Sequence, residues 1–215
     1  MSSNADDLLK ALYTAELKTE SLSGTDLSRL LEITPSGVTR IVHKLHRDGK
    51  VEYKRYQAIS LTSKGREEAA SLIRKHRLWE MFLLKVLKMP WEEVHREAEL
   101  LEHQTTNVLA DRICVFLGHP RKDVHGQPIP DKNGKIQVSR AQIPISLAEA
   151  GKNYTILSIS NESQRLLDYF RDIGLTVNAK ISLLEKIEPD GSLIISIKGI
   201  KSILSPQMAR NIFVE

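Results

Sequence analysis

The spacing of apolar residues divides this chain into a mostly helical part followed by a β part. Up to about residue 117 the apolar residues mostly recur three or four positions apart, as in amphipathic helices, with one strand-like segment at 51–61. Later they fall in short strand-like runs, at 154–159, 180–184 and 193–197. The intervening segment 118–140 is rich in proline and glycine, which is typical of a linker. We therefore expect a mostly α protein with a small β domain from about 143, which includes one helix near 163–172.

Composition excludes several classes of protein. The chain has 215 residues, of which 41% are hydrophobic and 27% charged, as in ordinary globular proteins. A single cysteine, Cys114, excludes an intramolecular disulfide framework and favours a reducing, cytoplasmic location. No apolar run approaches ~18 residues and the N-terminus is polar and acidic, so we expect neither a membrane partner nor a signal peptide.

Two helix-start signals and a hairpin pattern indicate a winged helix-turn-helix in the first third of the chain. Ser23, with Asp26 three residues later, matches a capping box. Thr34 followed by Pro35 matches an N-cap and the first helical position. Residues 51–61 alternate and are rich in β-forming types, as in the wing. This combination of elements is a DNA-binding fold.

The charge of this region supports DNA binding. The whole chain carries a net charge of only +4, but eight basic residues lie between 33 and 66, opposed by Asp48 and Glu52 alone. They are Arg40, Lys44, Arg47, Lys50, Lys54, Arg55, Lys64 and Arg66. The first turns of a recognition helix read base edges, and flanking lysines contact phosphates. The predicted DNA-binding residues are Thr34, Pro35, Ser36, Thr39, Arg40, Lys44 and Lys54. The alternative is a solvated face of a winged helix that binds protein.

Candidate metal ligands lie on two long helices, which we expect at 64–88 and 91–117. His76 and Glu80 are one turn apart on the first helix. On the second, a set of four falls within about 100° of helical arc, namely His95, Glu99, Glu102 and His103. Carboxylates and imidazoles without thiols favour Mn²⁺, Fe²⁺ or Zn²⁺. The alternative is that these residues form an ordinary solvated surface.

The same two helices carry more apolar side chains than one small winged helix can cover. They include Leu83, Leu84, Leu87, Val108 and Phe116. A two-fold homodimer would bury them, and its symmetry would match a palindromic operator in double-stranded DNA.

Motifs for other chemistry are missing from the sequence. It has no Gly-rich phosphate loop, no His-Glu-x-x-His and no Gly-x-Ser-x-Gly. We therefore expect no catalytic residues, no enzymatic activity and no small organic substrate. A metalloenzyme built on the His and Glu residues is the alternative, which the basic segment 33–66 disfavours.

Two motifs resemble one known family. The run Arg-Lys-His-Arg-Leu at 74–78, followed by Glu80, and the run 94–103 are similar to those of the diphtheria-toxin-repressor/manganese-transport-regulator family. The resemblance extends over the whole chain and implies the three-domain type. It implies a winged-helix domain at 1–73, a helical metal-binding and dimerisation domain with linker at 74–142, and an SH3-like β barrel of the ferrous-transport-A type at 143–215.

The resemblance also implies metal ligands. For a primary site they are Asp7, Glu99, Glu102 and His103, and for a second site His76, Glu80 and His95. Some three-domain relatives add a ligand from a Cys-Pro-His-Gly loop, which matches 123–126 here and makes Asp123 and His125 candidates. The C-terminal domain is expected to add Glu162 or Gln164. Lys10 stands where the short, two-domain relatives have a carboxylate ligand, which argues against their binuclear cluster.

The resemblance implies a manganese-dependent transcriptional repressor that binds a palindromic operator as a metal-loaded homodimer and controls metal-uptake genes. Iron-sensing relatives tend to have Met and Cys at the positions of Asp7 and Glu99, so two carboxylates favour Mn²⁺. We expect Zn²⁺ to bind but to activate less. The alternatives are an iron-dependent repressor that uses Fe²⁺ and a metal-independent winged-helix regulator.

Overall fold

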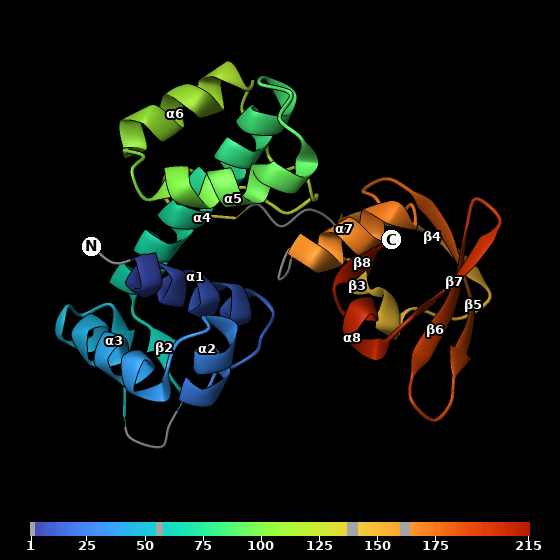
Figure 1. Cartoon of the computed structure of the whole chain (residues 1–215), viewed down its shortest axis with the longest axis horizontal. Coiled ribbons are helices and arrows are strands. Elements are labelled where there is room, and N and C mark those ends of the chain that lie inside the picture. Colours follow the sequence, from blue (N-terminus) through green and yellow to red (C-terminus); the bar gives the residue numbers. More distant parts are fainter. Residues whose placement is uncertain (1–2, 55–57, 137–141, 160–163) are drawn as a thin grey trace. The chain divides into compact units, whose positions relative to one another are not determined.

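The computed structural model describes residues 3–54, 58–136, 142–159 and 164–215 (Figure 1), so Arg55 and Glu162 lie outside the described residues. The chain forms two compact units. The first comprises Met1–Trp79, Glu97–His119 and Ile129–Ile136, and the second Glu80–Arg96, Pro120–Pro128 and Gln137–Glu215. No helix in the described ranges is both long and apolar enough to cross a membrane.

The first third of the chain is a winged helix-turn-helix, as predicted. Its elements are α1 (Ser3–Leu17), α2 (Gly24–Leu30), α3 (Pro35–Arg47), β1 (Val51–Glu52) and β2 (Ser60–Leu61), the two strands pairing antiparallel. The predicted capping box is present, since the Ser23 hydroxyl accepts from Asp26 N–H and the Asp26 carboxylate accepts from Ser23 N–H. Thr34 caps α3. Gly49, with a φ of +70°, follows α3 in the left-handed conformation that glycine adopts most easily.

One apolar core holds the winged helix together. It contains buried residues of α1, α2, α3, both strands and the first half of α4 (Ser63–Lys85). They include Leu8, Leu9, Leu27, Val38, Val42, Leu45, Leu61 and Ile73. Because α1 and α3 share this core, the position of α1 fixes that of the exposed face of α3.

The predicted long helix at 91–117 is wrong, because it is two helices, α5 (Trp91–Glu102) and α6 (Asn107–Phe116). Thr106 ends the continuity, since its side chain accepts from Leu109 N–H and caps α6. Thr105 also fixes the turn: its hydroxyl donates to Leu101 O and accepts from Trp79 Nε1–H, each over 2.7 Å. The helix predicted at 64–88 ends at Lys85.

The apolar residues expected at a dimer contact divide into two kinds. Leu83 is buried inside its own chain, so its assignment to a dimer contact is wrong. Leu84 is half-buried. Leu87, just after α4, is 57% exposed. Val108 and Phe116 are 71% and 66% exposed, so α6 presents an uncovered apolar face.

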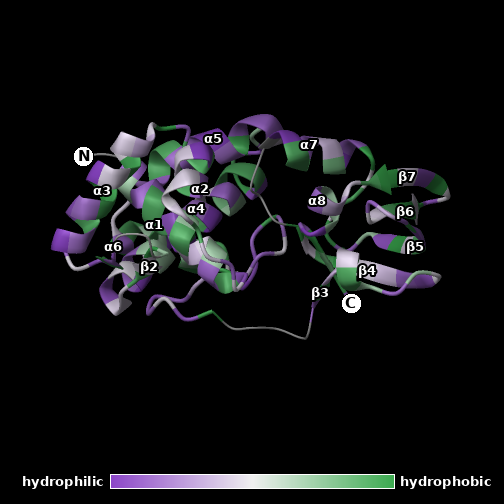
Figure 2. Cartoon of the chain, turned by 90° about the horizontal axis from the view of Figure 1, so that it is seen from below, coloured by the Kyte–Doolittle hydropathy of each residue, from purple (hydrophilic) through white to green (hydrophobic). Residues whose placement is uncertain are grey.

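The C-terminal part is a six-stranded antiparallel sheet in the order β3-β8-β4-β5-β6-β7. Its elements are β3 (Ile143–Pro144), a 3-10 turn (Ile145–Leu147), β4 (Lys152–Ile159), α7 (Gln164–Asp172), β5 (Lys180–Ile187), β6 (Ser192–Ile197), β7 (Ile200–Leu204), α8 (Pro206–Ala209) and β8 (Ile212–Val214). Hydrophobic residues are frequent along β4 to β7 (Figure 2), and in β6 Leu193, Ile195 and Ile197 are buried whereas Ile194 and Ser196 between them are partly exposed. The predicted mostly α fold with a C-terminal β domain is confirmed. The strands β3, β7 and β8 were not predicted from the sequence.

Candidate metal centre

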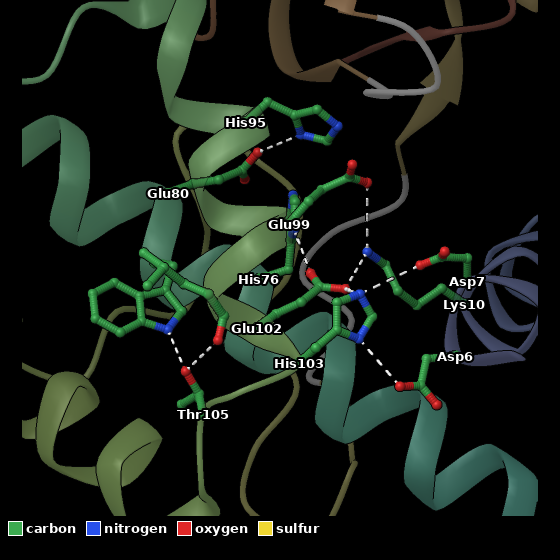
Figure 3. Close-up of polar contacts among 12 residues, drawn as sticks. Asp6, Asp7, Lys10, His76, Glu80, His95, Glu99, Glu102, His103 and Thr105 are labelled. Carbon is green, nitrogen blue, oxygen red and sulfur yellow. Dashed lines mark hydrogen bonds and ion pairs between the residues drawn. The ribbon is translucent and has the colours of Figure 1, made fainter. Parts of the chain in front are cut away.

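The primary group consists of Asp7, Glu102 and His103, whose ligand atoms all lie within 4.8 Å of one another. Asp7 comes from α1, whereas Glu102 and His103 lie at the end of α5, more than ninety residues later. Glu102 is the last residue of α5 and His103 follows it directly, so both side chains come from the end of this helix (Figure 3).

His103 is oriented by a residue that the sequence analysis did not single out. Its Nδ1 lies 3.1 Å from Asp6 Oδ2. A carboxylate only accepts hydrogen bonds, so Nδ1 carries the proton in this contact. The other nitrogen, Nε2, faces Asp7 Oδ1 at 3.6 Å and Glu102 Oε1 at 3.5 Å. A carboxylate behind a ligating imidazole is the usual support of a metal site, and its only sequence signal was the Asp6-Asp7 pair.

Glu102 is fully buried and both of its carboxylate oxygens have partners. His76 Nδ1 lies 2.6 Å from Oε2, and Lys10 Nζ donates to Oε1 over 2.6 Å. Burial alone would raise the pKa of Glu102, but the hydrogen bonds and charges of His76 and Lys10 outweigh it and hold the pKa below its ordinary value. Glu102 is therefore ionised at neutral pH, as a metal ligand must be.

The pKa of Asp7 is shifted in the opposite direction to the pKa of Glu102. Burial raises the pKa of Asp7, and the nearby charges of Lys10 and His103 lower it less than burial raises it. Protons therefore compete for this carboxylate as the pH falls, and its affinity for a cation falls with them.

Glu99, one of the four predicted primary ligands, is not gathered into the group. Its side chain is 51% exposed, and its Oε1 lies 3.9 Å from Lys10 Nζ. It precedes Glu102 by one turn of α5, so its carboxylate stands at the solvent side of the group (Figure 3).

The second group centres on Glu80, which is fully buried on α4. His95 Nδ1 of α5 lies 3.2 Å from Glu80 Oε1, and His125 Nε2 of the 120–128 loop lies 3.6 Å from the same oxygen. His76, one turn before Glu80 on the same helix, forms with Glu80 and His95 a set of donors that can hold a metal ion. The role of His125 as a ligand stays a prediction.

Backbone contacts fix the loop that carries His125. Asp123 Oδ1 accepts from the N–H groups of His125 and Gln127, each over 2.8 Å, so one oxygen of this predicted ligand organises the loop. His125 O accepts from Ile159 N–H of β4 over 2.9 Å. At Gly126, with a φ of +77°, a Cβ would lie 2.2 Å from Leu157 O. Only glycine allows this approach, so the loop is held against β4.

The predicted DNA-binding residues lie together at and near α3. All seven side chains are exposed, namely Thr34, Pro35, Ser36, Thr39, Arg40, Lys44 and Lys54. Two hydroxyls are already used: that of Thr34 accepts from Gly37 N–H, and that of Thr39 donates to Pro35 O. Arg40 and Lys44, one turn apart, are exposed charged donors that this helix offers to a ligand.

The donor sets of both groups fit a divalent cation. In the described residues each group joins at least one fully buried carboxylate to one or more imidazoles, with no sulfur ligand. Buried carboxylates are costly unless positive charge compensates them. Oxygen and imidazole donors suit Mn²⁺, Fe²⁺ and Zn²⁺.

Three family models together match almost the entire chain. Residues 1–59 match the iron-dependent repressor N-terminal DNA-binding domain, and residues 62–131 match the iron-dependent repressor metal-binding and dimerisation domain. Residues 143–215 match the FeoA domain.

Several known repressors are similar to this chain over all or part of its length. The chain is 28% identical to the iron-dependent repressor IdeR of Mycobacterium leprae over 96% of this chain and 94% of that one. It is 31% identical to the HTH-type transcriptional regulator MntR of Geobacillus kaustophilus, over 55% of this chain and 83% of MntR. Among solved structures, a manganese-dependent transcriptional repressor in complex with manganese matches with a TM-score of 0.88 and 32% identity, over 98% of each chain.

Proposed function

We propose that this chain, which belongs to the diphtheria-toxin-repressor/manganese-transport-regulator family of metal-dependent transcriptional repressors, is a manganese-dependent repressor that binds a palindromic operator as a homodimer. The observation that carries this proposal is the primary group. It joins Asp7 of the winged helix to Glu102 and His103 at the end of α5.

The residues of the primary group couple metal to DNA through packing. Asp7 lies on α1, which shares its core with α3, and His103 is oriented by Asp6 on the same helix. A cation held by Asp7, Glu102 and His103 supplies positive charge that two carboxylates need in order to lie close together. Because the cation prefers the state in which α1 and α5 are joined, metal affinity and DNA affinity rise together.

The choice of Mn²⁺ is supported by the donor atoms. The ligands proposed for the primary site are Asp7, Glu99, Glu102 and His103, three carboxylates and one imidazole. Mn²⁺ prefers oxygen donors, whereas sulfur donors favour later or softer ions. The similarity to a manganese-dependent repressor supports the same choice. The similarity to an iron-dependent repressor makes Fe²⁺ the second candidate. For the second site we propose His76, Glu80, His95 and His125.

The proposed DNA interface is the exposed face of α3 with Lys54 of the wing, and the proposed dimer contact is the apolar face of α6. Val108 and Phe116 are exposed there, within the segment that matches a dimerisation domain. A two-fold dimer would place two α3 helices in successive major grooves, about 34 Å apart. The regulated genes that best fit such a metal-loaded repressor are metal-uptake genes.

The test is metal-dependent DNA binding. A duplex selected from random sequences in the presence of Mn²⁺ is titrated with the protein in Mn²⁺, in Zn²⁺, in anaerobic Fe²⁺ and in chelator. We expect the tightest binding with Mn²⁺, weaker activation by Zn²⁺ and none with chelator. Stronger activation by Fe²⁺ would replace manganese by iron in the proposal. Equal binding in chelator would make the protein a metal-independent regulator.

Arg40→Ala tests the DNA interface. If Arg40 contacts a base, operator affinity falls by about 1–3 kcal/mol and specificity relaxes at one position. The control is Arg210→Ala, which removes the same charge from an exposed residue of the C-terminal domain. Equal affinity of Arg40→Ala and wild type would remove Arg40 from the interface.

A further inference from the structure

We propose that Lys10 is an internal counter-ion, which holds the primary group together in the metal-free protein and which a divalent cation has to displace in order to bind there. The proposal rests on the proposed function, because it presupposes that the primary group takes a metal. It adds that the chain itself contains the competitor for its metal.

The geometry places the Lys10 ammonium on a ligand atom. Its Nζ donates to Glu102 Oε1 over 2.6 Å, and the same oxygen faces His103 Nε2 at 3.5 Å (Figure 3). The oxygen of Glu102 that would bind a cation together with His103 is therefore the one that Lys10 occupies. The other oxygen, Oε2, is engaged by His76. Each oxygen of Glu102 thus already has a hydrogen-bonding partner while Lys10 stays in place.

The surroundings keep Lys10 in this position. Its side chain is only 17% exposed, and its Nζ also lies 3.9 Å from Glu99 Oε1. Lys10 follows Asp7 by one turn of α1, so Asp7 and Lys10 lie on the same helix face. The ammonium therefore lies next to Glu102 and Glu99, two of the carboxylates that we propose as metal ligands, and shares a helix face with the third, Asp7.

Two electrostatic effects act in the same direction. In the metal-free protein, Lys10 compensates the buried charge of Glu102, which would be costly to leave alone. When a divalent cation is present, the ammonium and the cation repel each other over a short distance. Lys10 thus stabilises the empty group and destabilises the filled one, and it raises the metal concentration at which the group fills.

The experiment is a titration of the full-length protein with Mn²⁺ alone by isothermal calorimetry. All proteins carry His95→Ala, so that the second group contributes little heat. Lys10→Met keeps the aliphatic stem and removes the charge, and we expect its Kd for Mn²⁺ to be at least about tenfold lower than that of the parent. Lys10→Arg keeps a charge and should remain close to the parent.

Lys50→Met is the matched control. Lys50 Nζ lies 2.6 Å from Glu68 Oε1 and its side chain is 20% exposed, so the pair resembles Lys10 and Glu102 in length and in lysine exposure. It is not part of either ligand group, so this variant should leave the Kd for Mn²⁺ unchanged. An equal gain in Lys50→Met would mean that loss of any lysine charge tightens metal binding, and it would overturn the specific role of Lys10.

Thermal unfolding gives a second readout that does not depend on DNA. Without metal, Lys10→Met should have a lower Tm than the parent, and saturating Mn²⁺ should raise its Tm by more than it raises the parent's. If Lys10→Met does not fold, Lys10→Gln carries the same expectation. An unchanged or higher Kd in the neutral variants would overturn the role of Lys10 alone, whereas a parent that does not bind Mn²⁺ would overturn the proposed function as well.

Discussion

The primary group and the second group use the same residue types but are built from different contacts. The primary group joins α1, which belongs to the winged-helix core, to the end of α5, more than ninety residues away. The second group joins α4 and α5 to a loop whose backbone is bonded to β4. The first is therefore attached to the element that positions α3, and the second to the C-terminal sheet.

From this difference we expect the two groups to have different roles in DNA binding. On the proposed function, a cation in the primary group would act on the position of α1 and hence on DNA binding. A cation in the second group would act on the 120–128 loop and on β4, which contain no predicted DNA contact. We therefore expect the primary group to switch DNA binding and the second group to tune it.

The largest effect is expected from Asp7→Ala. Asp7 is the one proposed metal ligand that α1 supplies, so operator affinity in saturating Mn²⁺ should fall to the level measured in chelator. Fluorescence anisotropy with labelled operator measures it. Glu16→Ala is the control, since Glu16 lies on α1 but pairs with Arg66 at a half-exposed site. Wild-type operator binding by Asp7→Ala at the same Mn²⁺ concentration would refute the proposed link.

A smaller effect is expected from Asp6→Asn. The change weakens the carboxylate support of His103 without removing a proposed ligand, and loss of such a support typically costs 10–100-fold in metal affinity. Calorimetry with Mn²⁺ should show this loss, while operator affinity at saturating Mn²⁺ stays near that of wild type. A loss of operator affinity that saturating Mn²⁺ does not restore would mean that Asp6 acts on DNA binding directly.

His95→Ala tests the comparison between the two groups at the second group. It should remove Mn²⁺ binding at the second group, because His95 lies 3.2 Å from Glu80. It should change the Kd of the primary group by only a few-fold, so that DNA binding still responds to metal. If His95→Ala abolishes metal-dependent DNA binding as completely as Asp7→Ala does, the division of labour between the groups is wrong.

The smallest effect is expected from Thr106→Ala, which removes the N-cap of α6. Loss of such a cap typically costs about 1 kcal/mol of stability. Urea denaturation measures it, and Thr25→Ala is the comparison, since Thr25 is exposed and is not the cap of α2. Equal stability of Thr106→Ala and wild type would mean that Trp79 and Thr105 alone hold the turn.

The sequence predicted the structural features that depend only on residues close together in the chain. The caps at Ser23 and Thr34 are local, so they could be recognised without a structure. The break between α5 and α6 was missed, because the contact of Thr105 with Trp79 joins residues far apart in the chain.

The same limit applies to the candidate site. The helical spacing of His and Glu predicted which residues of α4 and α5 come together in the two groups, and their roles as ligands stay a prediction. It did not predict that Asp6 supports His103 or that Lys10 reaches Glu102, because both contacts require α1 and α5 to meet. Nor did it predict that the carboxylate of Glu99 lies at the exposed side of the group, since rotamers and solvent exposure depend on the packed structure.

The most direct test of the account measures the affinity of one operator duplex for wild type and for Asp7→Ala across a Mn²⁺ titration. The account predicts that wild-type affinity rises with Mn²⁺ and that the half-maximal Mn²⁺ concentration matches the calorimetric Kd of the primary group. It predicts no rise for Asp7→Ala. A rise of the same size in both proteins would contradict the claim that a metal at Asp7, Glu102 and His103 couples to the DNA-binding face.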